Sequence, residues 1–280
     1  MSSKTEVLKC LTDRKGTYIS GENMARELGL SRNAVWKAVK ALKSDGFMIL
    51  SSTNRGYMLE NEPDVLSEAS IRSQLDPKIG DIGIKEYPVI ESTSETAKKM
   101  ALDGAPHGTI VVADGQTCGR GRRSHGFYSP EGGIYVSMIL RPENFPYRDA
   151  KTVTAYAAVA AVQTIFTASG KRAGIKPVND IFLDGKKVCG ILTESMSDFE
   201  SGDIAWIVIG IGMNYCLKED ELPEELRGKA GSVFGPSDHK VTRSRIIADL
   251  AERLLTGFLT ACEEDVIREY ESLLINVTQK

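Results

Sequence analysis

The stretch QTCGRGRRSHGF, from Gln116 to Phe127, is the most informative part of this 280-residue sequence. It follows the continuous apolar run 109–113, which is typical of a buried strand. Its three glycines let a ligand approach the backbone, and its three arginines bind phosphate or carboxylate as planar forks. It has neither the Gly-Lys-Ser/Thr of a P-loop nor the G-x-G-x-x-G of a dinucleotide site. From composition alone, a basic surface patch is an equally good interpretation.

Two other segments place polar side chains beside expected elements. Ser92, Thr93 and Ser94 put hydroxyl groups at a helix N-terminus, which suits a polar or anionic group, although an ordinary helix cap would look the same. Asn179 and Asp180 precede a strand, where they are able to hold Mg²⁺ or a ribose.

A third group of candidates lies on the strands that follow. Asp184-Gly185 predicts a tight hairpin between strands at 181–183 and 188–192, with Lys187 near the turn. A lysine there holds a phosphate or, more simply, points into solvent. The apolar run 204–211 ends in Gly210-Ile211-Gly212-Met213-Asn214, whose glycines suit either ligand approach or packing. With a strand at 134–140 and a long Ala-rich helix at 149–169, these elements predict an α+β domain with a mixed sheet.

The first 60 residues predict a winged helix-turn-helix. Helical spacing of apolar residues marks a helix at 4–13, a second that Ser20 caps and Gly29 ends, and a third that Ser31 caps. Short strands at 47–50 and 56–59 form the wing. The candidate DNA contacts on the third helix and the wing tip are Ser31, Arg32, Asn33, Trp36, Lys37 and Arg55. A small helical domain that binds protein is the alternative.

The charge distribution favours the DNA interpretation. Residues 1–59 hold ten Lys/Arg and five Asp/Glu, whereas residues 60–280 hold 25 and 33. A basic head on an acidic body suggests two domains with different partners. The net charge of −3 excludes a chain that is basic throughout.

The remaining composition indicates a soluble, cytoplasmic protein with no membrane partner. The five cysteines are widely spaced without a C-x-x-C, which favours a reducing compartment. The N-terminus lacks the apolar core of a signal peptide, and the longest apolar stretch, 153–168, is interrupted by polar residues. Three widely separated histidines argue against a histidine metal site or a catalytic triad.

In this order, the segments resemble the biotin protein ligase family (biotin–acetyl-CoA-carboxylase ligases) over about residues 5–255. The N-terminal winged helix makes the chain similar to the bifunctional type, which is both ligase and biotin operon repressor. The resemblance implies a winged helix-turn-helix domain at 1–62 and a ligase domain at 63–265. The family's usual C-terminal SH3-like barrel is expected to be missing or truncated, because 266–280 shows no run of alternating strands.

The resemblance also implies a reaction and its participants. Biotin and ATP with Mg²⁺ would give biotinyl-5′-AMP, and a lysine of a biotin carboxyl carrier protein domain would then take the biotin. A ligand-bound homodimer would bind palindromic operator DNA. The alternatives are a biotin-sensing transcription factor with weak or lost ligase activity and, less well supported, a lipoyl-type ligase.

The site residues follow from the same resemblance. Those expected at biotin are Ser92, Thr93, Ser94, Gln116, Arg120, Gly121, Arg122, Lys187 and Gly190. Those expected at ATP are Arg120, Arg122, Arg123, Phe127, Asn179, Asn214, Gly210 and Gly212. Arg122, Lys187 and Asp180 would be catalytic, and Asp180 and Asn214 would hold the metal. Pro177 departs from the family pattern, which usually has Trp there, and Phe127 stands where Trp is common.

Overall fold

A computed structural model describes residues 2–61, 63–141, 150–197, 202–236, 238, 241–260 and 262–275. The chain divides into two compact units. The first comprises Met1–Pro77 with Thr242–Ala248, and the second comprises Lys78–Val241 with Asp249–Lys280.

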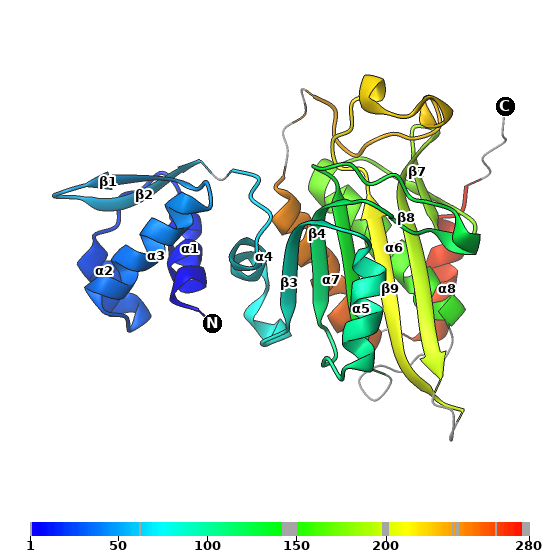
Figure 1. The fold of residues 1–280 in the computed structure, drawn as a ribbon, viewed down its shortest axis with the longest axis horizontal. Helices are drawn as coiled ribbons and strands as arrows, with labels where there is room; N and C mark the ends of the chain where they lie inside the picture. Colours follow the sequence, from blue (N-terminus) through cyan, green and yellow to red (C-terminus); the bar gives the residue numbers. More distant parts are fainter. Residues whose placement is uncertain are drawn as a thin grey trace. The chain divides into compact units, whose positions relative to one another are not determined.

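The first unit has the order predicted for a winged helix-turn-helix. Three helices, α1 (Ser3–Asp13), α2 (Gly21–Leu28) and α3 (Arg32–Ser44), precede the hairpin of β1 (Met48–Ser52) and β2 (Gly56–Asn61) (Figure 1). The hydroxyl of Ser31 accepts a hydrogen bond from the Ala34 amide at 3.1 Å, which starts α3. Gly29 ends α2 at a φ of 65°, a conformation that glycine adopts without side-chain strain.

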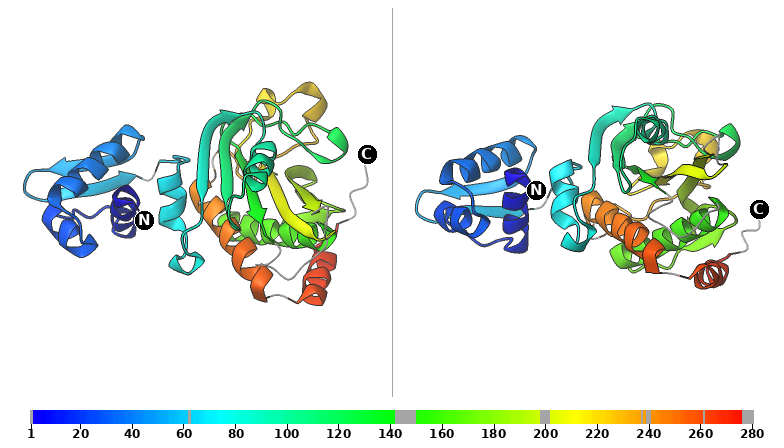
Figure 2. Two further views of the ribbon diagram at one scale, coloured as in Figure 1. Left: turned by 60° about the horizontal axis from the view of Figure 1, so that its bottom comes forward. Right: turned by 90° about the horizontal axis from the view of Figure 1, so that it is seen from below.

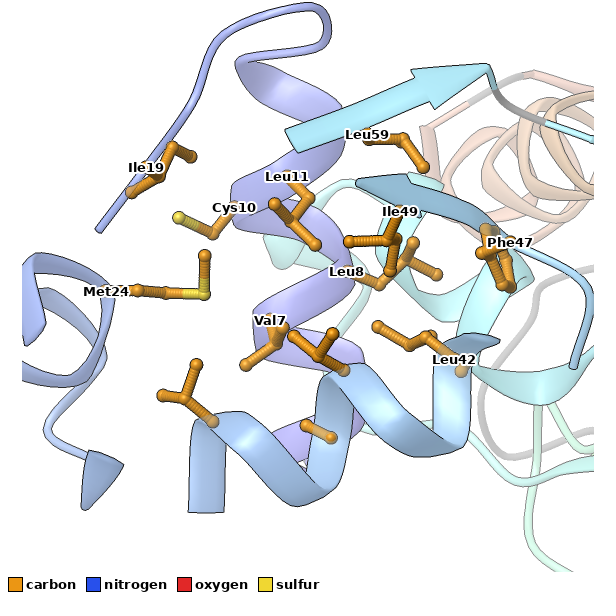
Figure 3. Close-up of a cluster of buried hydrophobic side chains, with 14 of the residues drawn as sticks. Val7, Leu8, Cys10, Leu11, Ile19, Met24, Leu42, Phe47, Ile49 and Leu59 are labelled. Carbon is orange, nitrogen blue, oxygen red and sulfur yellow. The ribbon is translucent and has the colours of Figure 1, made fainter. Parts of the chain in front are cut away.

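Apolar faces of these helices and of the wing meet in one core (Figure 3). Leu8 and Leu11 of α1 pack with Leu42 of α3 and with Leu59 of β2, and all four are at most 1% exposed. The unit also includes α4 (Glu68–Gln74) and the start of α7 (Arg243–Thr260), where Arg243 Nε pairs with Asp64 at 2.6 Å. The segment between β2 and α4 is thus tied to the start of α7.

The second unit is built on a mixed sheet, as the sequence predicts, and this sheet has seven strands in the structure. The strands are β3 (Ile84–Ile90), β4 (Ile110–Gln116), β5 (Ile134–Leu140), β6 (Gly174–Lys176), β7 (Asp180–Leu183), β8 (Lys186–Ser197) and β9 (Ile204–Met213). Their order is β3-β4-β5-β9-β8-β7-β6, and only β3 and β4 pair in parallel. The predicted hairpin turn joins β7 to β8, with Asp184 and Gly185 at φ of 51° and 76°.

Helices cover both faces of this sheet (Figures 1 and 2). Helix α5 (Thr93–Leu102) lies on one face, where Lys98 pairs with Glu194 of β8 at 2.8 Å. Helix α6 (Ala150–Ser169) lies on the other, where Thr154 donates to Thr193 at 2.8 Å. Since successive strand residues point to opposite faces, these two contacts define the sides of β8. Short 3₁₀ turns within the described ranges lie at Pro77–Ile79, Arg122–Ser124, Glu219–Glu221 and Glu224–Leu226.

Helix α6 is the one described helix that is long and apolar enough to cross a membrane, but 72% of its apolar window is buried within the protein. It is therefore a core helix. Its outer side carries α8 (Glu263–Ser272), a helix that the sequence pattern did not indicate. After α8 the backbone of Leu273 and Ile275 bonds to Ile175 of the edge strand β6, at 2.8 and 2.9 Å.

Candidate active site

A cavity of about 490 Å³ opens on the α5 side of the sheet, bounded by the glycine–arginine loop 120–127 and by β8 and β9. Its volume is within the range of sites that bind small molecules. The lining comes from Thr93, Ser94, Gln116, the loop residues Arg120–Arg123 and His125–Phe127, Pro177–Asp180, Lys187, Gly190–Leu192 and Gly210–Gly212.

Glycines on neighbouring strands form the floor. Gly190 of β8 pairs directly with Gly212 of β9, which leaves a gap with no side chains on the cavity face. The ring of Phe127 fills it: an added Cβ would lie 3.1 Å from the ring at Gly190 and 2.5 Å at Gly212. At Gly210 an added Cβ would lie 2.3 Å from the hydroxyl of Ser94. These glycines therefore make room for other side chains of the site.

A chain of hydroxyl groups and one amide connects α5 to the strands. Gln116 Oε1 accepts hydrogen bonds from the Thr93 amide at 2.8 Å and from its hydroxyl at 3.2 Å, and Gln116 Nε2 donates to Ser129 at 2.9 Å. Ser137 donates to Thr93 at 2.9 Å and lies 3.1 Å from the hydroxyl of Ser94. Such a network fixes the direction of each group before a polar ligand binds.

The glycine–arginine loop closes on itself through backbone hydrogen bonds. The amide of Gly121 donates to His125 at 2.7 Å, and that of Phe127 donates to Gly119 at 2.8 Å. Gly119 has no space for a side chain, because an added Cβ would lie 2.3 Å from the Phe127 carbonyl oxygen. Arg123 has a left-handed φ of 54°. The loop is thus a defined structure that presents arginines to the cavity.

Three cationic side chains of the cavity lining have partners on neighbouring elements. Arg120 pairs with Glu95 of α5 at 3.2 Å, and Arg122 donates to Asn179 Oδ1 at 3.2 Å. Lys187 Nζ pairs with Asp180 at 2.6 Å and lies 5.7 Å from the centre of the Phe127 ring. These cations converge from two elements, so they are able to neutralise more than one anionic group.

Two pKa shifts accompany this arrangement. A hydrogen bond from Lys98 is the main cause that lowers the pKa of Glu95, so this carboxylate stays charged beside Arg120. Burial raises the pKa of the Cys189 thiol to about 12. Cys189 is therefore an unreactive core thiol.

The structure brings together most of the expected ligand-binding residues. Those that line the cavity are Thr93, Ser94, Gln116, Arg120, Gly121, Arg122, Arg123, Phe127, Asn179, Asp180, Lys187, Gly190, Gly210 and Gly212.

Two of the expected ligand-binding residues lie outside this lining. Ser92 is buried and accepts a hydrogen bond from the Glu95 amide at 3.4 Å, as the cap of α5. Asn214 is also buried, and its Nδ2 donates to the carbonyl oxygens of Gly231 at 2.8 Å and Lys187 at 3.4 Å. Asn214 thus holds the backbone of Lys187 from outside the cavity lining.

Three polar residues that were not singled out from the sequence contact the expected site residues. They are Glu95, Ser129 and Ser137. Only Ser137 carries a signal in the sequence, as a polar residue in the otherwise apolar run 134–140.

The donor set for a metal is small. In the parts of the chain that the structure describes, no group of three His, Cys, Asp or Glu side chains is placed to hold an ion. Asp180 is the carboxylate in the cavity lining. One carboxylate fits Mg²⁺ that arrives with a nucleotide, since Mg²⁺ commonly takes its other ligands from phosphate and water.

The first unit presents the predicted DNA contacts to solvent. Ser31, Arg32, Asn33, Trp36 and Lys37 are all exposed on α3, and the Trp36 side chain is 51% exposed. Arg55, between β1 and β2, is exposed and stacks on the Tyr18 ring at 4.1 Å. Apolar and cationic groups thus share one exposed helix face.

Comparison with known proteins agrees with both units. Residues 86–214 match the biotin/lipoate A/B protein ligase family, and residues 4–58 match an HTH domain. The bifunctional ligase/repressor BirA of Bacillus spizizenii is 39% identical over 245 residues, 87% of this chain and 74% of that protein. BirA of Escherichia coli is 30% identical over 74% of this chain and 62% of its own length.

A solved structure shares the fold of the ligase part. The biotin protein ligase from Aquifex aeolicus, in complex with biotin and ATP, aligns with a TM-score of 0.58 and 24% identity, over 69% of this chain and 78% of that one. The cavity, the helix-turn-helix and these likenesses have one explanation: the chain belongs to the biotin/lipoate A/B protein ligase family, on the branch of bifunctional ligase/repressors.

Proposed function

We propose that this chain is an ATP-dependent biotin protein ligase that forms biotinyl-5′-AMP and transfers the biotin to a lysine of a biotin carboxyl carrier protein domain. The observation that carries the proposal is the convergence of Arg120, Arg122 and Lys187 on one cavity, beside the hydroxyl–amide network of Thr93 and Gln116. Fixed hydroxyl and amide groups suit the neutral, polar head of biotin, and the cations suit its carboxylate and the α-phosphate.

In the first step the biotin carboxylate attacks the α-phosphorus. A bond forms between the carboxylate oxygen and phosphorus, and the bond from phosphorus to the pyrophosphate oxygen breaks. Both reactants are anions, so the protein has to offset their repulsion and align them. Arg122 supplies positive charge from the loop and Lys187 supplies it from β8, and Asp180 pairs with the Lys187 ammonium at the cavity.

In the second step the carrier lysine amine attacks the acyl carbon, and AMP leaves with the electrons of the acyl–oxygen bond. The carboxylate is itself the nucleophile in the first step and the carrier lysine in the second, so no enzyme nucleophile is required. Mg²⁺ bound with ATP would neutralise phosphate charge, and Asp180 is the residue that would hold it. Asn214 remains a proposed second ligand, although its amide nitrogen is engaged with backbone oxygens.

The first unit would make the same chain a biotin-responsive repressor. Helix α3 would enter the major groove of operator DNA, and Arg55 would contact phosphate or the minor groove. A ligand-bound homodimer would present two such helices to a palindromic site. The ligase and repressor activities would both take place in the cytoplasm.

The test combines labelled biotin, MgATP and a purified carrier domain. We expect a labelled carrier and, without the carrier, biotinyl-5′-AMP detected by mass spectrometry. DNA binding with biotin binding, but with neither product, would support the second candidate, a biotin-sensing transcription factor without ligase activity. Calorimetric binding of lipoate in preference to biotin would indicate a lipoyl-type ligase instead.

A further inference from the structure

One wall of the cavity is a short turn between two strands. Residues 177–179 connect β6 to β7, and Pro177, Val178 and Asn179 all line the cavity. The Val178 side chain is 41% exposed, so little packing holds the turn from the solvent side. Its position depends on a few polar contacts.

On the inner side those contacts run through Asn179. Its Oδ1 accepts the hydrogen bond from Arg122 at 3.2 Å, and its Nδ2 donates to the Ile191 carbonyl oxygen at 2.5 Å. The Ile191 amide in turn donates to the Asn179 carbonyl oxygen at 3.0 Å. The place of the Arg122 guanidinium is therefore coupled to the turn.

On the outer side the turn is held by α8. The hydroxyl of Tyr270 donates to the Val178 carbonyl oxygen at 2.9 Å. Burial raises the pKa of Tyr270, against an opposing effect of the nearby Arg122 charge, so the phenol stays protonated and remains a donor at neutral pH.

Helix α8 is itself well anchored. Glu263 accepts a hydrogen bond from Thr152 of α6 at 2.8 Å, and Glu269 accepts one from Gln163 of α6 at 2.6 Å. The backbone after α8 pairs with β6, immediately before the turn. Tyr270 thus extends from an anchored helix, and its hydroxyl group connects that helix to the turn.

We propose that Tyr270 is a positioning residue of the ligase site: through Val178 and Asn179 it fixes the wall against which Arg122 is held. The inference rests on the proposed function for its catalytic consequence. Its structural consequence, a turn and a loop held in place by Tyr270, can be measured without any activity.

The variant is Tyr270→Phe in the full chain, which removes one hydroxyl and keeps the ring. Tyr156→Phe is the matched control, because Tyr156 likewise donates to a backbone carbonyl, that of Arg253 at 2.7 Å, on the far side of the sheet. Loss of one hydrogen bond corresponds to roughly a 2- to 12-fold effect. We expect Tyr270→Phe to speed hydrogen exchange in residues 120–126 and 178–179 by about this factor, and Tyr156→Phe to leave these segments unchanged.

With ligands present, Tyr270→Phe should speed the release of biotinyl-5′-AMP and raise KM for biotin by a similar factor, with kcat changed less. In an Asn179→Ala background the same substitution should add little, because the link to Arg122 is already cut. Unchanged exchange in Tyr270→Phe, or effects that simply multiply in the double variant, would overturn the inference. If the wild type formed no adenylate, the proposed function would fall, while the exchange measurement would still decide the role of Tyr270.

Discussion

Gly212→Ala is the most direct test of how the cavity is built. The new Cβ would lie 2.5 Å from Cε1 of Phe127 and 2.9 Å from two further ring carbons. Carbon atoms in contact are normally about 3.5–4.0 Å apart, so the ring has to retreat by roughly 1 Å. It cannot do so toward Gly190, where the ring already lies close to the backbone, and Tyr135 packs edge-on at 6.4 Å between ring centres. The ring must therefore move into the cavity.

The cost has two parts. Overpacking of this kind lowers the free energy of unfolding by about 1–3 kcal/mol. A ring displaced by about 1 Å also shifts the Lys187 ammonium group that lies over it. Such misplacement of reacting groups costs on the order of 100-fold in rate. We therefore expect Gly212→Ala to lower kcat/KM for biotinyl-5′-AMP formation by at least tenfold, together with a drop in denaturant midpoint.

Two further variants make the result decisive. Gly235→Ala is the control, since its Cβ would come no closer than 3.7 Å to a neighbour and its backbone is outside the left-handed region. Phe127→Ala removes the obstructing ring, so adding Gly212→Ala to it should cost little further stability. If Gly212→Ala is as stable and active as Gly235→Ala, or is equally harmful without the Phe127 ring, the proposed role of the glycine pair is wrong.

Three further predictions concern separate parts of the chain. Arg122→Ala should let biotinyl-5′-AMP escape, because a cation beside the phosphate is lost; labelling of bystander lysines measures this, and labelling equal to wild type would contradict the assignment. Because burial raises the pKa of Cys189 to about 12, iodoacetamide at pH 8 should modify exposed Cys118 and leave Cys189 as the thiol, as judged by peptide mass spectrometry; equal modification would mean that β8 opens readily. Lys37→Ala should reduce the slope of log binding constant against log salt for operator DNA by about one, whereas Lys15→Ala, exposed but outside α3, should not; identical slopes would remove Lys37 from the DNA interface.

Much of the fold followed from local rules. The cap at Ser31 and the hairpin at Asp184-Gly185 occur as expected, because each depends on residues only a few positions apart. Helix α8 escaped prediction: its apolar face is sparse, with Val266 as its buried residue, and it is held by contacts with α6 and β6. Tertiary contacts of that kind leave no periodic pattern in the sequence.

The candidate site likewise has residues whose place the sequence predicted and residues whose place depends on tertiary contacts. The glycines and arginines of the 120–127 loop indicated either a ligand loop or a basic surface patch, and the structure places Arg120, Arg122 and Arg123 on the cavity. Asn214 was expected there as well, from the family resemblance. Strand β9 ends at Met213, however, and the Asn214 amide bonds to the Val188 carbonyl oxygen, so its side chain turns to the backbone. Ser92 likewise serves as a cap rather than a lining residue.

The sequence by itself therefore determined the kinds of elements, the two-part organisation and the chemical character of the ligand loop, since these depend on short-range geometry and residue type. Only the tertiary structure decided that Gly190 and Gly212 become neighbours and that Phe127 fills the space between them. It also decided that Tyr270, more than 90 residues after Val178 in the chain, supports the same cavity. Strand register and helix docking bring together residues that are distant in sequence, and they are set by how the whole sheet buries its two faces.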